Sequence, residues 1–95
     1  MDNVRPLPTE FGLSQNVPNP FNPLTEICYQ LPEASGVVLA IYDVLGRKVE
    51  VLVEGFVEAG YRSVVWDAED AASGVYLVRM EVGDFVEVRK MALIR

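Results

Sequence analysis

The feature that most constrains the fold is the run Leu13–Pro23, LSQNVPNPFNP, with three prolines and three asparagines in eleven residues. Each proline fixes its φ angle at about −65°, lacks a backbone donor and holds the preceding residue in an extended conformation. The run therefore cannot form a helix or a central strand. Asn19-Pro20 and Asn22-Pro23 predict tight turns in which the asparagine side chains bond the local backbone. Phe21 is the one aromatic residue of the run, so we expect a stiff loop that inserts this ring into a neighbouring core.

Size and hydropathy indicate one small folded domain. The chain has 95 residues, of which 51% are hydrophobic, so a core can form and disorder of the whole is not expected. No apolar run approaches the roughly 20 residues that cross a bilayer. Met1–Pro6 lacks the apolar segment of a signal peptide. If the domain is exported, we expect its signal peptide on a larger parent chain.

The charge balance excludes some partners. Eight basic and fourteen acidic residues give a net charge of −6, and the basic residues form no cluster in the sequence. Nucleic-acid binding needs clustered cations, and an acidic surface is repelled by anionic membranes. We therefore expect neither a nucleic acid nor insertion into a membrane. Cys28 is the single cysteine, so an internal disulfide is excluded, and we expect a small, half-buried strand residue rather than a reactive thiol.

Alternating apolar and polar residues predict a series of short strands between glycines and prolines. The expected strands cover residues 25–31, 37–42, 47–53, 61–67, 74–82 and 85–94. We expect residues 13–95 to form one immunoglobulin-like antiparallel β-sandwich of about six or seven short strands. The Cys…Trp…Cys spacing of true immunoglobulin domains is absent. Residues 1–12 carry charges and two prolines, which predicts an extended linker.

The sequence also predicts the form of several turns, links and strand edges. Gly46 ends a tight turn that favours φ above zero, and Gly83-Asp84 has the order of a type II′ hairpin turn. Leu52 and Val53 in succession suggest that a bulge interrupts the alternation. Residues 54–60 are expected to be an irregular link that contains Phe56. If the strand over residues 85–94 lies at a sheet edge, another chain could pair with its free backbone groups.

Catalysis finds little support in the side chains. The chain has no histidine, so neither Cys28 nor a serine has the usual base that activates a nucleophile. These serines are Ser14, Ser35, Ser63 and Ser73. A non-catalytic protein without a cofactor is the expectation.

Two binding alternatives remain open at this point. Asp67, Glu69 and Asp70 could offer oxygen ligands to Ca²⁺, although a polar turn capped by Asp67 is favoured because the spacing of a known calcium loop is absent. Aromatic residues could form a sugar-stacking platform; these are Tyr42, Tyr61, Trp66 and Tyr76. The alternation instead places Trp66 and Tyr76 on core-facing sides of their strands. Asp43 and Arg47 flank a turn, and we expect them to pair across it.

The run over residues 13–23 resembles L-x-Q-N-x-P-N-P-F-N-P, the opening of C-terminal sorting domains (type A) of the type IX (Por) secretion system. Such domains end secreted proteins of the Bacteroidetes and related bacteria. Further matches follow in order along the chain. They are Tyr42–Arg47 with Y-D-x-L-G-R, Gly60–Asp67 with G-x-x-x-V-x-W-D, Ser73–Tyr76 with S-G-V-Y, and Lys90–Leu93 with K-M-x-L. The flagellar hook-capping protein has a related immunoglobulin-like module that shares the Y-D-x-x-G-R and S-G-x-Y patterns.

The resemblance implies a non-catalytic signal that directs its parent protein through the periplasm and across the outer membrane. The implied partners are type IX translocon components, an upstream cargo domain in the same parent chain, and a sortase-like cysteine peptidase that removes the domain and attaches the cargo to the cell surface. Cleavage is expected within residues 1–12, where extended backbone suits a protease. A carbohydrate-binding or adhesive module of a secreted hydrolase is the alternative, and a structural module of the flagellar-cap kind is a third hypothesis.

The resemblance also divides the motif residues into two groups. The residues expected to be read by the translocon are Lys90, Met91, Leu93 and Arg95. Those expected to serve the fold are Asn16, Pro18, Asn19, Pro20, Phe21, Asn22, Pro23, Tyr42, Asp43, Gly46, Arg47, Gly60, Trp66, Asp67, Ser73, Gly74 and Tyr76.

Overall fold

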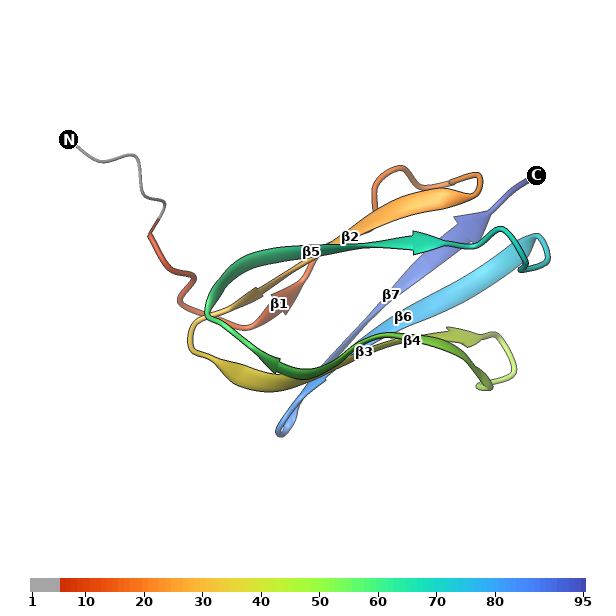
Figure 1. Ribbon diagram of the computed structural model, residues 1–95. Helices are drawn as coiled ribbons and strands as arrows, with labels where there is room; N and C mark the ends of the chain where they lie inside the picture. The colour runs from red at the N-terminus through yellow and green to blue at the C-terminus, as the bar shows by residue number, and fades with distance from the viewer. Residues whose placement is uncertain (1–5) are drawn as a thin grey trace.

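The computed structural model describes residues 6–95 and contains seven strands (Figure 1). They are β1 (Gly12–Leu13), β2 (Leu24–Leu31), β3 (Ser35–Asp43), β4 (Lys48–Val57), β5 (Gly60–Asp67), β6 (Gly74–Val82) and β7 (Phe85–Leu93). Among these described residues, no helix is long and apolar enough to cross a membrane.

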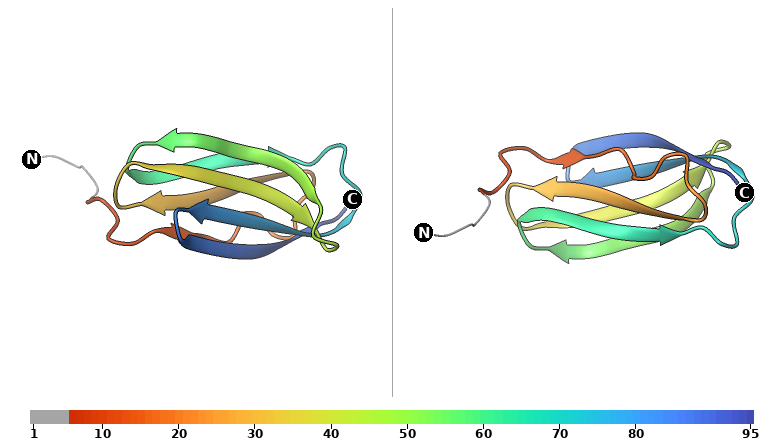
Figure 2. Two further views of the ribbon diagram at one scale, coloured as in Figure 1. Left: turned by 90° about the horizontal axis from the view of Figure 1, so that it is seen from below. Right: turned by 90° about the horizontal axis from the view of Figure 1, so that it is seen from above.

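The strands form two antiparallel sheets that lie face to face (Figure 2). The small sheet has the order β1-β2-β5, and the large sheet has the order β4-β3-β6-β7. The chain therefore changes sheet between β2 and β3, between β4 and β5, and between β5 and β6. The predicted all-β, immunoglobulin-like sandwich of short antiparallel strands is confirmed.

The core between the sheets follows the alternation of the sequence. On β2, Ile27, Tyr29 and Leu31 point inward, and on β3 the inward residues include Leu39 and Ile41. The alternate residues of β6 complete this layer, namely Tyr76, Val78, Met80 and Val82. Since each of these side chains is buried against the opposite sheet, burial of apolar area is the main contribution to stability.

β4 is longer and less regular than the sequence suggested. The irregular link expected over residues 54–60 is wrong, because β4 continues to Val57 and β5 begins at Gly60. Gly55 adopts φ 147° and remains paired with β3. The expected bulge is confirmed: Leu39 opposes Val53 while Ala40 opposes Val51, so one extra residue lies between them.

The tight turns take the expected forms. Gly46 has φ 83° and Gly83 has φ 56°. No described residue other than glycine has a positive φ, so Asp84 cannot take the second left-handed position that a type I′ turn requires. The hairpin between β6 and β7 is therefore type II′, as predicted.

The outer face of the small sheet corrects one expectation. Cys28 is exposed rather than half-buried, because its face of β2 points away from the core and no third layer covers it. A shallow hollow of about 310 Å³ lies beside it, lined by residues that include Ser14, Tyr29 and Ser63. Burial raises the pKa of the Tyr29 hydroxyl, and the charge of Arg62 offsets part of this rise.

Candidate functional site

The proline loop, residues 13–23, is anchored by an aromatic cluster. Phe21 is 1% exposed, and its ring centroid lies 5.6 Å from that of Trp66. The ring of Tyr76 meets Trp66 edge-on at 5.4 Å. Trp66 Nε1 donates to Glu50 at 3.1 Å, and the Tyr76 hydroxyl donates to the Ala72 carbonyl at 2.6 Å. The predicted insertion of Phe21 is confirmed, and Trp66 and Tyr76 belong to the core, not to an exposed sugar platform.

A buried asparagine shapes the loop from within. Asn16 Nδ2 donates to the Pro18 carbonyl at 3.1 Å and to Thr25 Oγ1 at 2.9 Å. Thr25 Oγ1 in turn donates to the same carbonyl at 2.9 Å. The peptide bonds that precede Pro18, Pro20 and Pro23 are cis. The side-chain network satisfies polar groups that burial would otherwise leave unpaired.

Backbone hydrogen bonds join this loop to the last strand. Phe21 N donates to the Ala92 carbonyl at 2.9 Å, and Ile94 N donates to the Phe21 carbonyl at 3.0 Å. Phe21 and Leu93 thus form a parallel β-bridge. In Figure 1 the loop beside β2 and the end of β7 lie at the same end of the molecule.

Side chains of the loop extend this junction. Gln15 Nε2 donates to the Lys90 carbonyl at 2.7 Å, and Asn19 Oδ1 accepts from Ala92 N at 2.9 Å. Together with the backbone bonds of Phe21, these contacts occupy the outward backbone groups of β7 over residues 90–94. We call this junction of residues 15–21 with residues 90–94 the terminal clasp.

The terminal clasp changes the interpretation of β7 as a free edge. β7 is the last strand in the order of the large sheet, but only its first half is open at the outer side. Near that half, Leu13 bonds the side chains of Glu87 and Arg89, each at 2.9 Å. The condition stated for pairing with another chain, a place at the sheet edge, is met, but free outward backbone groups remain only in the first half of β7. A partner strand along residues 90–94 would have to displace the loop.

The expected recognition residues divide into two pairs. Met91 and Leu93 are each 1% exposed and face the core, so a partner cannot contact them while the domain is folded. Lys90 is exposed. Arg95 is also exposed, but its guanidinium donates to the carbonyl of Ala68 at 2.8 Å and to the carbonyls of the next loop residues. This arginine holds the loop between β5 and β6.

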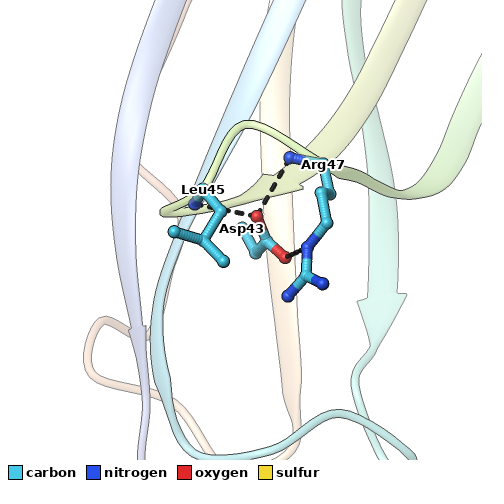
Figure 3. A network of polar contacts seen from close by, with 3 residues as sticks. All are labelled: Asp43, Leu45 and Arg47. Atoms are coloured by element: carbon cyan, nitrogen blue, oxygen red, sulfur yellow. Dashed lines mark hydrogen bonds and ion pairs between the residues drawn. The ribbon is translucent and has the colours of Figure 1, made fainter.

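The turn between β3 and β4 shows how a family motif can serve local geometry (Figure 3). Asp43 Oδ1 accepts from Leu45 N at 2.9 Å and from Arg47 N at 3.0 Å, and Oδ2 pairs with Arg47 Nε at 2.8 Å. The predicted pair across the turn is confirmed. The pKa of the Asp43 carboxyl lies below its usual value. The main cause is the hydrogen bond from the Arg47 backbone, and the hydrogen bond from the Arg47 side chain lowers it further. Tyr42, which precedes Asp43, lies half-buried on the outer face of the large sheet.

The loop between β5 and β6 forms the polar turn that the sequence favoured. Asp67 Oδ1 accepts from Glu69 N at 3.1 Å. Within residues 6–95, no group of three histidine, cysteine or acidic residues is placed to hold a metal ion. Ser73 is exposed, and Gly60 and Gly74 begin β5 and β6 opposite Leu31 and Leu93.

The remaining motif residues lie at the surface of the loop. Pro18, Asn19, Pro20 and Asn22 are exposed, and Pro23 is half-buried. The sequence did not reveal the terminal clasp, because no local pattern connects a loop near one end to a strand at the other. The one indication in the sequence was that the proline loop and the last strand both carry motifs of the same family.

These features define a small β-sandwich module whose first and last ordered segments are bonded together. Comparison with protein families identifies it further: the family described as a secretion system C-terminal sorting domain matches residues 17–94. The chain belongs to this family, whose members are signals for type IX secretion. Its parent protein is therefore exported, to the medium or the cell surface, through interaction with the type IX machinery. No curated protein and no solved structure matches the chain.

Proposed function

We propose that the type IX machinery reads this domain in its folded form, at the end of the molecule that the terminal clasp assembles. The observation that carries the proposal is the bonding of the proline loop to β7, since it makes one surface from the two most separated family motifs. Exposed Lys90 provides the charged contact. Buried Met91 and Leu93 hold the strand in place, and Arg95 fixes the adjacent loop.

The segment before the sandwich is proposed as the cleavage region. A sortase-like cysteine peptidase would cut there and attach the upstream cargo to the cell surface. Support comes from residues 8–11, which contact the sandwich: Pro8 is buried, the Glu10 carbonyl accepts from Gln30, and the Phe11 ring lies 5.7 Å from that of Phe85. A protease needs several residues of extended chain, so the cut falls before this ordered part. Residues 1–5 of the expected linker lie outside the described residues.

Kinship with the immunoglobulin-like module of the hook-capping protein is part of the same proposal. The shared patterns map here to the turn stabilised by Asp43 and to the core residue Tyr76. Both positions serve the fold. We therefore infer that the two modules share a fold but not a function.

A secretion assay tests the proposal. A fluorescent reporter with a Sec signal is fused to residues 1–95 and expressed in a host with a working type IX system. The intact fusion should reach the medium or the surface. Removal of residues 90–95 deletes two core side chains and so tests folding as much as recognition. Lys90→Glu is the sharper variant, because it leaves the core unchanged.

The matched control is Glu26→Lys on the exposed face of the small sheet, which reverses a charge on the opposite sheet from Lys90 and keeps the backbone hydrogen bonds between Glu26 and Val17. We expect Lys90→Glu to be retained in the periplasm as a folded protein and Glu26→Lys to be exported. Normal export of Lys90→Glu would remove Lys90 from the recognition surface and leave the sorting function intact. Retention of the intact, folded fusion would contradict the sorting function itself.

A further inference from the structure

The outer face of the large sheet carries an unusual row of side chains. Lys48 on β4 opposes Tyr42 on β3, Tyr42 opposes Leu77 on β6, and Leu77 opposes Lys90 on β7. The row therefore crosses all the strands of this sheet with a lysine at each end. Strands lie about 4.8 Å apart, which puts the lysine backbones roughly 14 Å from each other.

The middle of this face is apolar. Tyr42, Leu77 and Val88 line a shallow hollow of about 230 Å³ together with Gly46 and Arg79. Exposed valines continue the apolar surface; Val75, Val86 and Val88 are 40%, 46% and 45% exposed. The solvated face of an antiparallel sheet is ordinarily polar. Because these apolar side chains lie around one hollow on three neighbouring strands, this part of the surface is typical of a contact with another molecule.

The lysines of the row differ from the other cations of the described chain. Arg47 pairs with Asp43, Arg89 pairs with Glu87, Arg62 donates to backbone carbonyls, and Arg95 donates to the loop after β5. The side chains of Lys48 and Lys90 make no ion pair or hydrogen bond with any residue from 6 to 95. In a protein of net charge −6, two unpaired cations on either side of an apolar hollow form a locally positive binding surface.

We propose that this face docks an acidic protein segment of the export machinery. One apolar side chain of that segment fills the hollow, and carboxylates on either side of it pair with Lys48 and Lys90. The proposal rests on the proposed sorting function and names the chemistry of its partner. It makes Lys90 the point where the docking face meets the terminal clasp.

Charge decides between this occupant and two others. The carboxylates on this face belong to Glu54 on β4 and Glu81 on β6, which both oppose Val38 on β3. Glu81 already pairs with Arg79 at 3.4 Å. A second copy would thus bring two unpaired lysines but one unpaired carboxylate, Glu54, to the contact. An anionic membrane would attract the lysines but repel the remainder of the acidic domain.

The test compares two double variants of the reporter fusion. Lys48→Gln with Lys90→Gln removes the charges of the row, and Ser63→Glu with Val65→Glu makes an equal change in net charge on exposed positions of the small sheet. We expect export of the first variant to fall at least about tenfold, as for loss of an interface hot spot. The second variant should be exported normally. Lys48→Arg with Lys90→Arg keeps the charges and should retain export.

Two controls distinguish failure of the docking-face proposal from misfolding of a variant and from failure of the sorting function. Each purified domain is unfolded thermally, and Leu77→Asp, which places a charge in the hollow, provides a second variant of the face with its own export measurement. Equal export of the wild type, the lysine variant and Leu77→Asp overturns the docking face and leaves the sorting function standing. Failure of the folded wild-type fusion to leave the periplasm contradicts the sorting function, on which this proposal rests.

Two further measurements decide between the occupants. In sedimentation velocity, a dimer that the lysine substitutions abolish would assign the face to a second copy and overturn the proposal. Co-sedimentation with phosphatidylglycerol vesicles that depends on the same lysines would assign the face to a membrane and would also overturn it. A monomer that ignores the vesicles, combined with lysine-dependent export, supports the acidic partner.

Discussion

The two outer faces of the sandwich differ in a way that folding alone does not explain. In both sheets buried and exposed residues alternate along the strands, and no third layer of structure covers the outer face among the described residues. The face of the small sheet carries acidic Glu26 and Asp67 beside exposed Leu24 and Val65, whereas the face of the large sheet carries unpaired lysines on either side of Leu77 and Val88. Since stability depends mainly on the inner faces, the comparison separates residues that hold the fold from residues that meet a partner.

The largest effect should come from substitution on the inner side of the large sheet. Met91→Ala is expected to lower the free energy of unfolding by about 2–5 kcal/mol, because it leaves a cavity in a core where Met91 is 1% exposed. Its neighbour Lys90→Gln should change stability by less than about 0.5 kcal/mol. Urea denaturation of both variants measures the difference. A similar loss for both would contradict the division between inner and outer residues.

An intermediate effect is expected from the polar network of the proline loop. Asn16→Ala removes the hydrogen bonds to buried Thr25 and to the Pro18 carbonyl and the one accepted from Gln15, and it should lower the free energy of unfolding by about 1–3 kcal/mol. Because the loop positions the terminal clasp, the amide hydrogens of Ala92 and Ile94 should exchange faster. Native-state hydrogen exchange checks this, with amides of β2 as internal controls. Unchanged exchange at both positions would separate the loop network from the clasp.

Cys28 provides a smaller test of the small-sheet face. Since its thiol is exposed, a water-soluble disulfide reagent should modify it completely in native buffer without prior unfolding. Cys28→Ser should change the free energy of unfolding by less than about 0.5 kcal/mol and should not alter export. Slow, denaturant-dependent modification would show that this face is covered in solution.

The smallest effect concerns acid stability at the Asp43 turn. The pKa of the Asp43 carboxyl is lowered in the folded protein, chiefly by the hydrogen bond from the Arg47 backbone. Its contribution to stability is therefore present above the unfolded pKa, about 3.9, and is lost as pH falls through the lower folded value. Asp43→Asn should remove this contribution. The gap in melting temperature between wild type and variant should narrow as pH falls below about 4; a constant gap would contradict the assignment.

Local patterns were sufficient to predict most of the fold and only part of the site. Alternation placed Ile27 and Val78 in the core correctly, and it predicted the bulge beside Leu52 because two apolar residues in succession break the period. It was wrong at residues 54–60, since Gly55 can stay in a strand when its neighbour β3 pairs with it. Local sequence is a poor guide where cross-strand pairing decides the outcome.

The site depended on contacts that no local pattern contains. The bonds from Phe21 to Ala92 and from Gln15 to Lys90 connect distant parts of the chain. The exposure of Cys28 depended on the absence of a covering layer, which alternation does not report. The apolar outer face was readable in principle, because Tyr42 and Leu77 alternate with core residues and yet are themselves large and apolar.

If the export machinery reads the folded domain, as proposed, the terminal clasp also makes export depend on a complete chain. Its contacts, and the neighbouring bond from Arg89 to Leu13 across 76 positions, close the longest loops of the fold. Contacts between residues this far apart in the sequence have the largest loop-closure entropy to overcome. A chain that stops short of Ile94 cannot make the bond to Phe21. An exporter that requires the closed sandwich would therefore select against prematurely terminated proteins, whatever cargo they carry.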